Sequence, residues 1–515
     1  MAVPDPTQVA PWYLRNINPA LELDETTGNV FVRTGLASGG NIIITGNVTI
    51  PGEIDTHITS IGSLANITTP YMPIGGNVIV TSGNITAVVS GTVAVSSIAA
   101  NVTVVDGGGS ITVDGNVNAT ITGGNVATTI TGTNLDAFGR LRVSNPVTLF
   151  DSQNRYIDGE QFSSITATSG NVVYVANESS FNLNVSAASG SSVIRQSKTV
   201  QAYQPGKSLL IMNTFAMATL KANLTQRVGY FTADNGIYFE AVGTQLNLVI
   251  RSSTTGSIVE ERIPQASWNG NTLLSGTVLD PTLTQIFWCD VEWLGVGNVR
   301  TGFVINGEFI VCHTFQHANQ PGNTTVYMTT ATLNPRYEIT NTGATSGNST
   351  MKQICSTVIS EGGYTPSTKI GYVTNNTVPT RVSSANTVTA LCSIRLNPAY
   401  PDAVVVPAQL DLLLIDVRYG QFQLIENATF TTSFSNVAGS VVQTAIHSNV
   451  ITDGNVVYSG LTSSRDEVEI GDDVKKRIQL WRTAAGTPST LTLAVAYTAT
   501  NADLLWKFGW EELTN

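Results

Sequence analysis

Gly46-Asn47-Val48-Thr49-Ile50 is the first of several similar phrases in one long stretch of the sequence. The phrase returns at Gly76-Asn77-Val78, Gly83-Asn84-Ile85, Gly115-Asn116-Val117 and Gly124-Asn125-Val126. β-Branched residues favour extended backbone, and a Gly-Asn pair can supply the positive φ of a tight turn. The repeated phrase therefore predicts short strands joined by turns.

The repetitive stretch, residues 37–135, has few large side chains from which to build a core of its own. It contains no Lys, Arg, Phe or Trp, and Tyr71 is its one tyrosine. Its valines must therefore be buried against copies of the same pattern, either as stacked turns or as intertwined chains. We predict an elongated β shaft, β-helical or intertwined, which is typical of a structural fibre.

The composition of the whole chain favours an all-β protein. Charged residues make up 12% of the 515 residues, about half the usual share of roughly 25%. The net charge is −11, and the one basic run is Lys475-Lys476-Arg477. This charge balance predicts that nucleic acid is not a partner.

The N-terminus and the cysteines bear on the compartment. Met1–Leu14 lacks a basic segment followed by an apolar run, so we expect no signal peptide. No run of 18 apolar residues occurs, which predicts no membrane insertion. The cysteines, which lack C-x-x-C spacing, are predicted to be reduced and buried: Cys289, Cys312, Cys355 and Cys392.

Changes in composition predict four zones along the chain. Residues 1–36, which carry Trp12, Tyr13 and several charges, are interpreted as a docking segment with a hairpin-like Thr27–Val32. The shaft follows at 37–135, and basic and aromatic residues return at Asp136. We predict a lectin-like jelly-roll domain over 136–425 and a small β-sandwich over 426–515.

Two local patterns give specific structural predictions. Asn306-Gly307 between apolar flanks predicts a tight hairpin over Gly302–Ile310. In Ser464–Arg482, the fourfold spacing of Ile470, Val474 and Ile478 is compatible with one short helix, although Gly471 makes an exposed charged loop an equal alternative.

The segment that begins at Asp136 resembles virion structural proteins of tailed bacteriophages, in particular those of cyanobacterial phages. The resemblance covers residues 136–345 and rests on several motifs. They are Asp136–Ser144, Thr148–Gln153, Tyr203–Ser208, Gln226–Phe231, Glu292–Gly297, His313–Asn319 and Arg336–Ile339. The resemblance implies that the protein belongs to a phage particle, but not to which part of the particle. It provides no catalytic residues.

One strand has the spacing of a glycosidase motif. Asp290 and Glu292 are two residues apart and so share one strand face, as in the Glu-x-Asp-x-Glu strand of some jelly-roll glycosidases. That motif requires a carboxylate at position 288, where this chain has Trp288. A retaining pair of carboxylates is therefore not visible, and an exposed polar strand face is the preferred interpretation.

Other candidate sites are weaker. His313 and His317, with Cys312 and Cys289, are predicted to be structural rather than zinc ligands, because an extended segment separates the two rings. The Gly-rich Asp106–Ser110 lacks the lysine and helix of a phosphate loop. No nucleophile elbow and no cofactor site is found. Trp268 and Trp293, near polar turns, are candidate sugar-stacking residues, although core packing is the preferred interpretation.

These observations predict a non-enzymatic structural component of a phage particle, a homotrimeric fibre or appendage of the tail, neck or capsid that displays β domains. Its partners would be itself and other virion proteins, bound through residues 1–36. It would be located in the virion after assembly in the host cytoplasm. The alternative is a receptor-binding adhesin that recognises host surface glycan.

Overall fold

The computed structural model describes residues 21–23, 30–32, 145–156, 161–415, 419–463, 465–470 and 472–513. The chain divides into two compact units, Met1–Asn125 and Val126–Asn515. In the first unit, β1 (Leu21–Leu23) pairs antiparallel with β2 (Val30–Val32). The predicted shaft, 37–135, lies outside the described residues, as does most of the docking segment, so both stay predictions.

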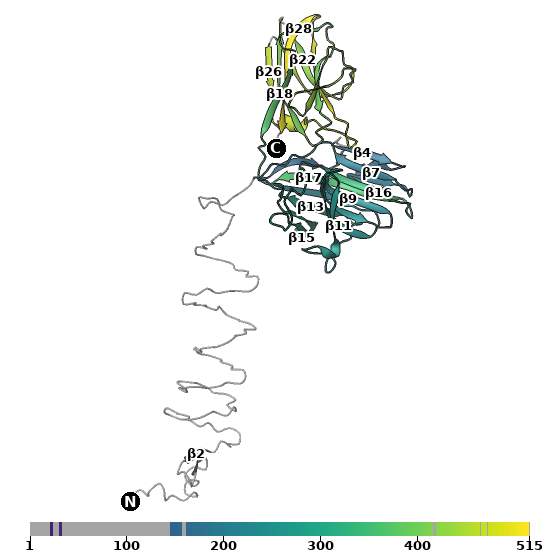
Figure 1. Cartoon of the computed structure of the whole chain (residues 1–515), viewed down its shortest axis with the longest axis vertical. Coiled ribbons are helices and arrows are strands. Elements are labelled where there is room, and N and C mark those ends of the chain that lie inside the picture. Colours follow the sequence, from purple (N-terminus) through teal and green to yellow (C-terminus); the bar gives the residue numbers. More distant parts are fainter. Residues whose placement is uncertain are drawn as a thin grey trace, which may run out of the picture. The chain divides into compact units, whose positions relative to one another are not determined.

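The described part of the second unit is all-β with antiparallel sheets, as predicted (Figure 1). Its first sandwich has two sheets. The seven-stranded sheet has the order β12 (Val259–Pro264), β11 (Gln245–Ser252), β10 (Gly236–Val242), β9 (Leu224–Phe231), β16 (Pro335–Asn341), β7 (Ser192–Ser197), β4 (Phe162–Ala167). The eight-stranded sheet has the order β15 (Glu308–Phe315), β14 (Val299–Ile305), β13 (Gln285–Val291), β8 (Leu209–Ala216), β17 (Ser349–Ser360), β6 (Ser180–Val185), β5 (Asn171–Val175), with β3 (Val147–Ser152) also paired to β17. Two 3₁₀ turns, η2 (Ala176–Glu178) and η3 (Gln265–Ser267), lie between strands.

The core of this sandwich follows the two-residue period of its strands. Alternate residues of β8 are buried, among them Leu209, Ile211 and Phe215. Phe239 of β10, in the other sheet, packs against Phe287 of β13 with ring centroids 6.1 Å apart. Large apolar side chains from both sheets thus form one core between them.

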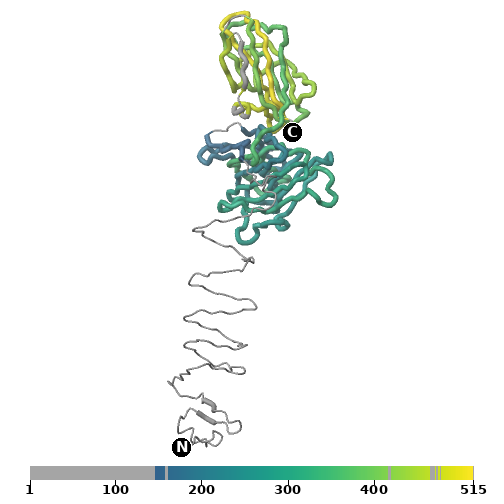
Figure 2. Tube along the Cα trace, turned by 90° about the vertical axis from the view of Figure 1, so that its left-hand side faces the viewer, coloured from purple at the N-terminus to yellow at the C-terminus, as the bar shows by residue number. Residues whose placement is uncertain are grey.

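A second sandwich occupies the C-terminal part of the chain. One sheet has the order β18 (Thr368–Thr374), β28 (Ala502–Leu513), β21 (Val404–Leu414), β26 (Arg465–Glu469), with β19 (Thr380–Val382) paired to β28. The other has the order β23 (Ser435–Asn436), β24 (Val442–Ile446), β20 (Thr389–Leu396), β27 (Thr490–Tyr497), β22 (Gly420–Glu426), β25 (Asn455–Thr462). In Figure 2, green and yellow strands lie side by side in this sandwich.

The strands do not divide at residue 425, where the sequence predicts a domain boundary. β18 to β22 precede that boundary but hydrogen-bond to strands that follow it, as in the pairing of β21 with β28 and of β20 with β27. The division between the sandwiches lies instead between β17 and β18. Composition does not change there, because strands of both sandwiches draw on the same β-branched residues.

Two local predictions are confirmed. Asn306 and Gly307 have φ of 53° and 84° and join β14 to β15, as a tight hairpin turn requires. The charged stretch contains α2 (Asp472–Arg477), so the helix interpretation holds. Ile470 and Ile478 on either side of α2 are buried in the second core. No helix in the described residues is long and apolar enough to cross a membrane.

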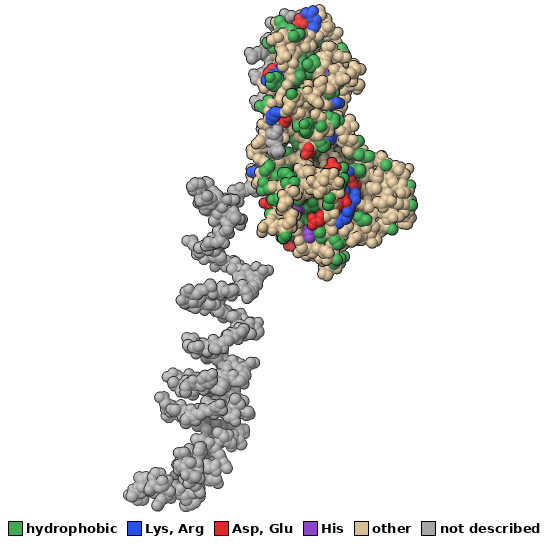
Figure 3. All heavy atoms as spheres, viewed as in Figure 1, with side chains coloured by type: hydrophobic (Ala, Val, Ile, Leu, Met, Phe, Trp, Pro, Cys, Tyr) green, Lys and Arg blue, Asp and Glu red, His purple; other side chains and the backbone are tan. Residues whose placement is uncertain are grey.

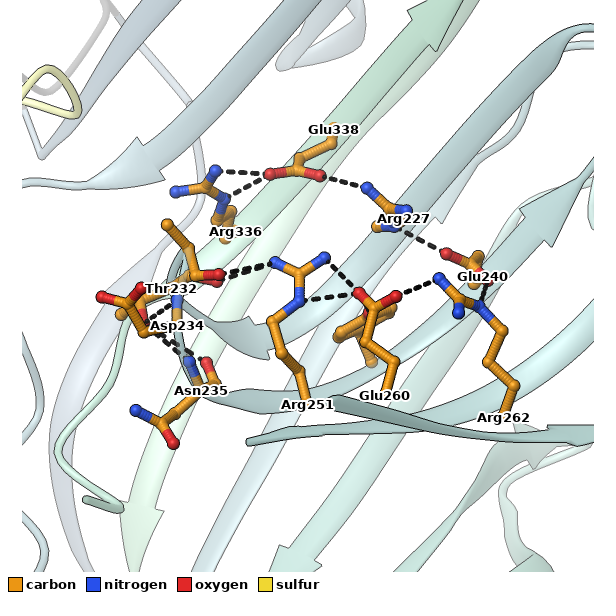
Figure 4. Close-up of polar contacts among 12 residues, drawn as sticks. Arg227, Thr232, Asp234, Asn235, Glu240, Arg251, Glu260, Arg262, Arg336 and Glu338 are labelled. Carbon is orange, nitrogen blue, oxygen red and sulfur yellow. Dashed lines mark hydrogen bonds and ion pairs between the residues drawn. The ribbon is translucent and has the colours of Figure 1, made fainter. Parts of the chain in front are cut away.

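The outer face of the seven-stranded sheet carries a layer of ion pairs that the sequence analysis did not anticipate (Figure 4). We call it the charged layer; its members are Arg227, Glu240, Arg251, Glu260, Arg262, Arg336 and Glu338. Glu240 is fully buried between Arg227 at 2.7 Å and Arg262 at 2.9 Å. Beneath the arginines lie Phe231 and Tyr238, which are fully buried because the guanidinium groups cover them.

Glu240→Gln should destabilise the first sandwich by about 3 kcal/mol, because it removes the fully buried carboxylate that Arg227 and Arg262 share and leaves these cations with Glu338 and Glu260 alone. The matched control is Asp503→Asn, which breaks the more exposed Arg381–Asp503 pair and should cost clearly less stability than Glu240→Gln. Urea unfolding measures both. Equal losses in the two variants would contradict a structural role for the charged layer.

Candidate functional site

The candidate site lies at the C-terminal end of β13, where one strand presents different chemistry on its two faces. Phe287, Cys289 and Val291 are fully buried in the core. The intervening Trp288 and Asp290 therefore point to the outer face of the eight-stranded sheet. The prediction of an exposed polar strand face is therefore wrong: Asp290 faces outward but is buried, and Glu292 lies just beyond the end of β13.

Asp290 is held by one ion pair and retains one unused oxygen. It lies directly opposite Arg300 of β14, whose Nε donates to Asp290 Oδ2 at 2.9 Å. The side chain of Asp290 is 10% exposed, whereas that of Arg300 is 57% exposed. Asp290 Oδ1 is buried and has no hydrogen-bond partner among the described residues. Such an unpaired buried acceptor is rare in folded proteins and is suited to a ligand donor.

Trp288 stands where the glycosidase motif has its first carboxylate. Its indole is nearly buried and meets Phe309 edge-on, with ring centroids 5.4 Å apart. Phe309 is 50% exposed and extends the aromatic surface toward solvent. Trp288 Nε1 is a second buried polar atom without a partner in the described structure. Trp288 and Asp290 thus present an unused donor and an unused acceptor from the same strand face.

Glu292 follows β13 at the start of a tight turn. Its backbone N–H donates to Asn298 O at 3.1 Å, and the turn between them passes through Leu294 and Gly295, both with positive φ. The N–H of Leu294 donates to the Tyr203 hydroxyl at 3.2 Å, which ties the turn to the loop before β8. The Glu292 side chain is exposed beside this turn.

A cavity of about 540 Å³ is lined by Asp290 and Glu292, whereas Trp288 and Phe309 lie outside its lining. Lys207 and Ser208 enter it from the loop before β8; Ser208 Oγ donates to Glu361 Oε2 at 2.8 Å, and Lys207 donates to Gly362 O. The remaining lining residues are Gly206, Asp290, Glu292, Leu294, Asn298, Arg300 and Thr314. With two cations and two carboxylates, the cavity has no net charge and many hydrogen-bonding groups.

Sequence reasoning found Asp290 and Glu292 but missed Lys207, Asn298 and Arg300. Arg300 could have been found from the sequence, although weakly. If β13 and β14 form a hairpin with a turn of this length, Arg300 lies opposite Asp290. Lys207 belongs to the motif Tyr203–Ser208, which contributes to the family resemblance but does not by itself indicate a binding site. Its approach to β13 depends on the pairing of β8 with β13, which joins segments about seventy residues apart.

The two candidate stacking tryptophans lie outside the cavity. Trp268 is buried, and its Nε1 donates to Ile263 O at 3.1 Å. Trp293 is half-buried against the core and meets Tyr203 edge-on at 5.7 Å. Both positions agree with the preferred interpretation of core packing.

The histidines and cysteines take part in packing. His313 Nδ1 accepts the N–H of Asn269 at 3.1 Å, and His317 stacks on Tyr327 at 3.8 Å with its Nδ1 beside Gly297 O at 2.8 Å. Cys289 and Cys312 are buried in the core, and burial raises the pKa of both thiols. The four cysteines are free, and Cys355 is only half-buried. Within the described ranges, no three metal-binding side chains gather.

No family model and no curated protein sequence matches the chain. Among solved structures, a β-1,3-glucanase of Mycobacterium marinum is 14% identical, with a TM-score of 0.29, over 41% of this chain and 98% of its own. A β-glucanase of Bacillus licheniformis is 11% identical, with a TM-score of 0.27, over 41% and 96%. A mixed-linkage glucan protein of glycoside hydrolase family 16 from Bacteroides ovatus is 12% identical, with a TM-score of 0.28, over 41% and 99%.

These matches correct two predictions. The sequence predicts a structural component of a phage particle and no enzymatic activity, whereas the matched structures are carbohydrate-active enzymes rather than virion proteins. On this comparison both predictions are wrong. The virion location, the homotrimer and the virion partners stay predictions, because neither the comparisons nor the structure bears on them.

The buried histidines predict a pH dependence of stability. Burial lowers the pKa of His313 and His317 below the usual value of about 6.5. As the pH falls below that value, the unfolded chain binds protons that the folded chain does not, so stability should decrease. We expect a lower urea midpoint for the first sandwich at pH 5.5 than at pH 7.5. Substituting both histidines with asparagine should flatten this dependence, and an unchanged midpoint in the unaltered protein would contradict it.

Proposed function

We propose that the first sandwich is a carbohydrate-recognising domain of the jelly-roll class, and that the cavity at the end of β13 is its site. The observation that carries the proposal is a pair of unused, buried hydrogen-bonding atoms on one strand face: Asp290 Oδ1, whose residue lines the cavity, and Trp288 Nε1, whose residue lies on the same strand outside the lining. A sugar hydroxyl can donate to the first and accept from the second. Burial without a partner costs free energy, which such a ligand would recover.

The surroundings of this pair support a sugar over a charged metabolite. The volume of about 540 Å³ is in the range of small-ligand sites. The negative charge of Asp290 is offset by Arg300, and the cavity as a whole is balanced. Outside the cavity lining, Phe309, half-exposed beside Trp288, offers an apolar surface of the kind on which a sugar ring packs. The glucanases among the matched structures suggest β-linked glucose polymers as the first ligands to test.

Asp290→Asn should weaken binding of soluble β-1,3-glucan or mixed-linkage β-glucan by about tenfold or more, because it removes a charged acceptor from the site. Isothermal titration measures the change, and circular dichroism checks the fold. The matched control is Glu308→Gln, an exposed carboxylate at the start of β15 that does not line the cavity. Equal affinity in the unaltered protein and Asp290→Asn would exclude this site.

A second candidate function, cleavage of a glycosidic bond, is favoured by the two carboxylates that line the cavity, Asp290 on β13 and Glu292 in the turn that follows it. We assign them as an inverting pair, whose carboxyl groups stand roughly 6.5–9.5 Å apart with a water between them. Glu292 would donate a proton to the leaving oxygen while Asp290 takes a proton from the attacking water. The water oxygen then bonds to the anomeric carbon as the glycosidic bond breaks. Trp288 would have no chemical step in this reaction.

If the domain cleaves β-glucan, the first sugar released should be the α-anomer, which proton NMR detects before mutarotation. Glu292→Gln should lower the rate by about a hundredfold or more, because it removes the general acid. Initial release of the β-anomer would contradict the inverting assignment. No release of reducing ends would leave binding as the function of the site.

A further inference from the structure

The two sandwiches are joined by a network of direct contacts. The N–H of Arg482 donates to Lys198 O at 3.2 Å, and the N–H of Ala484 donates to Ser163 Oγ at 2.6 Å. Gln479 Nε2 donates to Val200 O at 3.2 Å. Apolar side chains from both sandwiches pack together at Val200, Ala202 and Val404. The residues after α2 therefore dock onto the segment that follows β7.

A second cavity, of about 430 Å³, lies at this junction. We call it the junction cavity; it is lined by Phe162, Lys198, Glu426, Asn427, Gly454, Asn455 and Trp481. Phe162 and Lys198 come from the first sandwich, and the other residues come from the second. The cavity therefore exists only when the two sandwiches are docked, and neither the β13 site nor the charged layer contributes to it.

The charges of the junction cavity compensate one another around Trp481. Lys198 Nζ lies 4.4 Å from the centroid of the Trp481 ring, close enough for a cation–π contact. Trp481 Nε1 donates to Glu426 Oε1 at 3.0 Å. The cation thus lies over the face of the indole, and the carboxylate accepts the hydrogen bond from its N–H. A ligand in this cavity meets no net charge.

Two asparagine amides supply uncharged hydrogen-bonding groups. Asn427 Oδ1 accepts the N–H of Thr490 at 3.2 Å, which orients the amide and leaves its Nδ2 donor for another partner. Asn455, at the start of β25, is exposed, and its side chain makes no hydrogen bond with the rest of the described structure. Beside the amides lies the half-buried indole of Trp481, whereas Phe162 closes the cavity from the first core and is itself buried.

We infer that the junction cavity is a second carbohydrate-binding site, with uncharged sugars as its ligand class. Aromatic surface together with amide donors and acceptors fits a ligand that has both apolar ring faces and hydroxyl groups. A polyanion is disfavoured by the compensated lysine and by the net charge of −11. On the face drawn in Figure 3, Lys, Arg, Asp and Glu side chains gather in one band on the lower sandwich and are few elsewhere on the described surface. This inference does not depend on the function proposed for the β13 cavity.

The test uses the full-length chain in an Asp290→Asn background, in which the β13 site is impaired. The probes are glucose hexasaccharides with β-1,3, β-1,4 and α-1,4 linkages, titrated by calorimetry. At least one hexasaccharide should still bind, and Asn455→Ala or Lys198→Ala should weaken that residual binding about threefold to tenfold. The matched control is Asn449→Ala, an exposed asparagine of the same sandwich outside the cavity, which should change nothing.

The outcomes separate the two sites. Absence of residual binding in Asp290→Asn, or residual binding that Asn455→Ala and Lys198→Ala leave unchanged, would overturn the junction site while the β13 proposal stands. If Asp290→Asn changes nothing but Asn455→Ala weakens binding, the junction site holds and the β13 proposal fails. Binding of a hexauronate as tightly as of the neutral hexasaccharides would overturn the assigned ligand class.

Discussion

The two-residue period of β13 is the constraint on which the proposed site depends. Phe287, Cys289 and Val291 must face the core, because the first sandwich closes around them. Because side chains alternate along a strand, Trp288 and Asp290 must then point outward. The strand is anchored on its buried face, and Arg300 and Phe309 hold the outward side chains of Asp290 and Trp288 in place. The unused atoms at Asp290 and Trp288 are therefore a fixed feature of the sheet rather than of a loop.

The outer face of the seven-stranded sheet, in contrast, has no unused polar atoms among the members of the charged layer. It is covered by arginine side chains that lie over Phe231 and Tyr238 and are paired with glutamates. Glu338 bridges Arg336 and Arg227, and burial of this carboxylate is offset by both cations, which lower its pKa. Every charged side chain of this layer has an ion-pair partner, so we interpret its role as structural. The site with unused polar atoms is on the opposite sheet.

Features that depend on residues close together in the sequence could be predicted, whereas features that join distant residues could not. Hairpins depend on neighbours, so Asn306-Gly307 was sufficient to locate the turn between β14 and β15. The alternation around Asp290 likewise needs only adjacent residues. The charged layer joins Arg227 to Glu338, over a hundred residues apart, through the pairing of β9 with β16. No local pattern marks such a partner.

The sequence predicted a wrong domain boundary and did not indicate the junction cavity, and both follow from the same cause. β28 is the last strand of the chain yet lies between β18 and β21, so residues 368–425 belong with the C-terminus. Lys198 and Trp481 meet only after both sandwiches have folded and docked. Composition identifies strands but not which strands pair, and the placement of sites between distant segments depends on that pairing.

The most direct test of the central claim is hydrogen exchange measured by mass spectrometry, with and without saturating soluble β-glucan. Binding at the end of β13 should slow amide exchange in peptides that cover residues 206–212 and 285–300. Unchanged exchange in both segments, with the polysaccharide bound to the protein, would contradict the site.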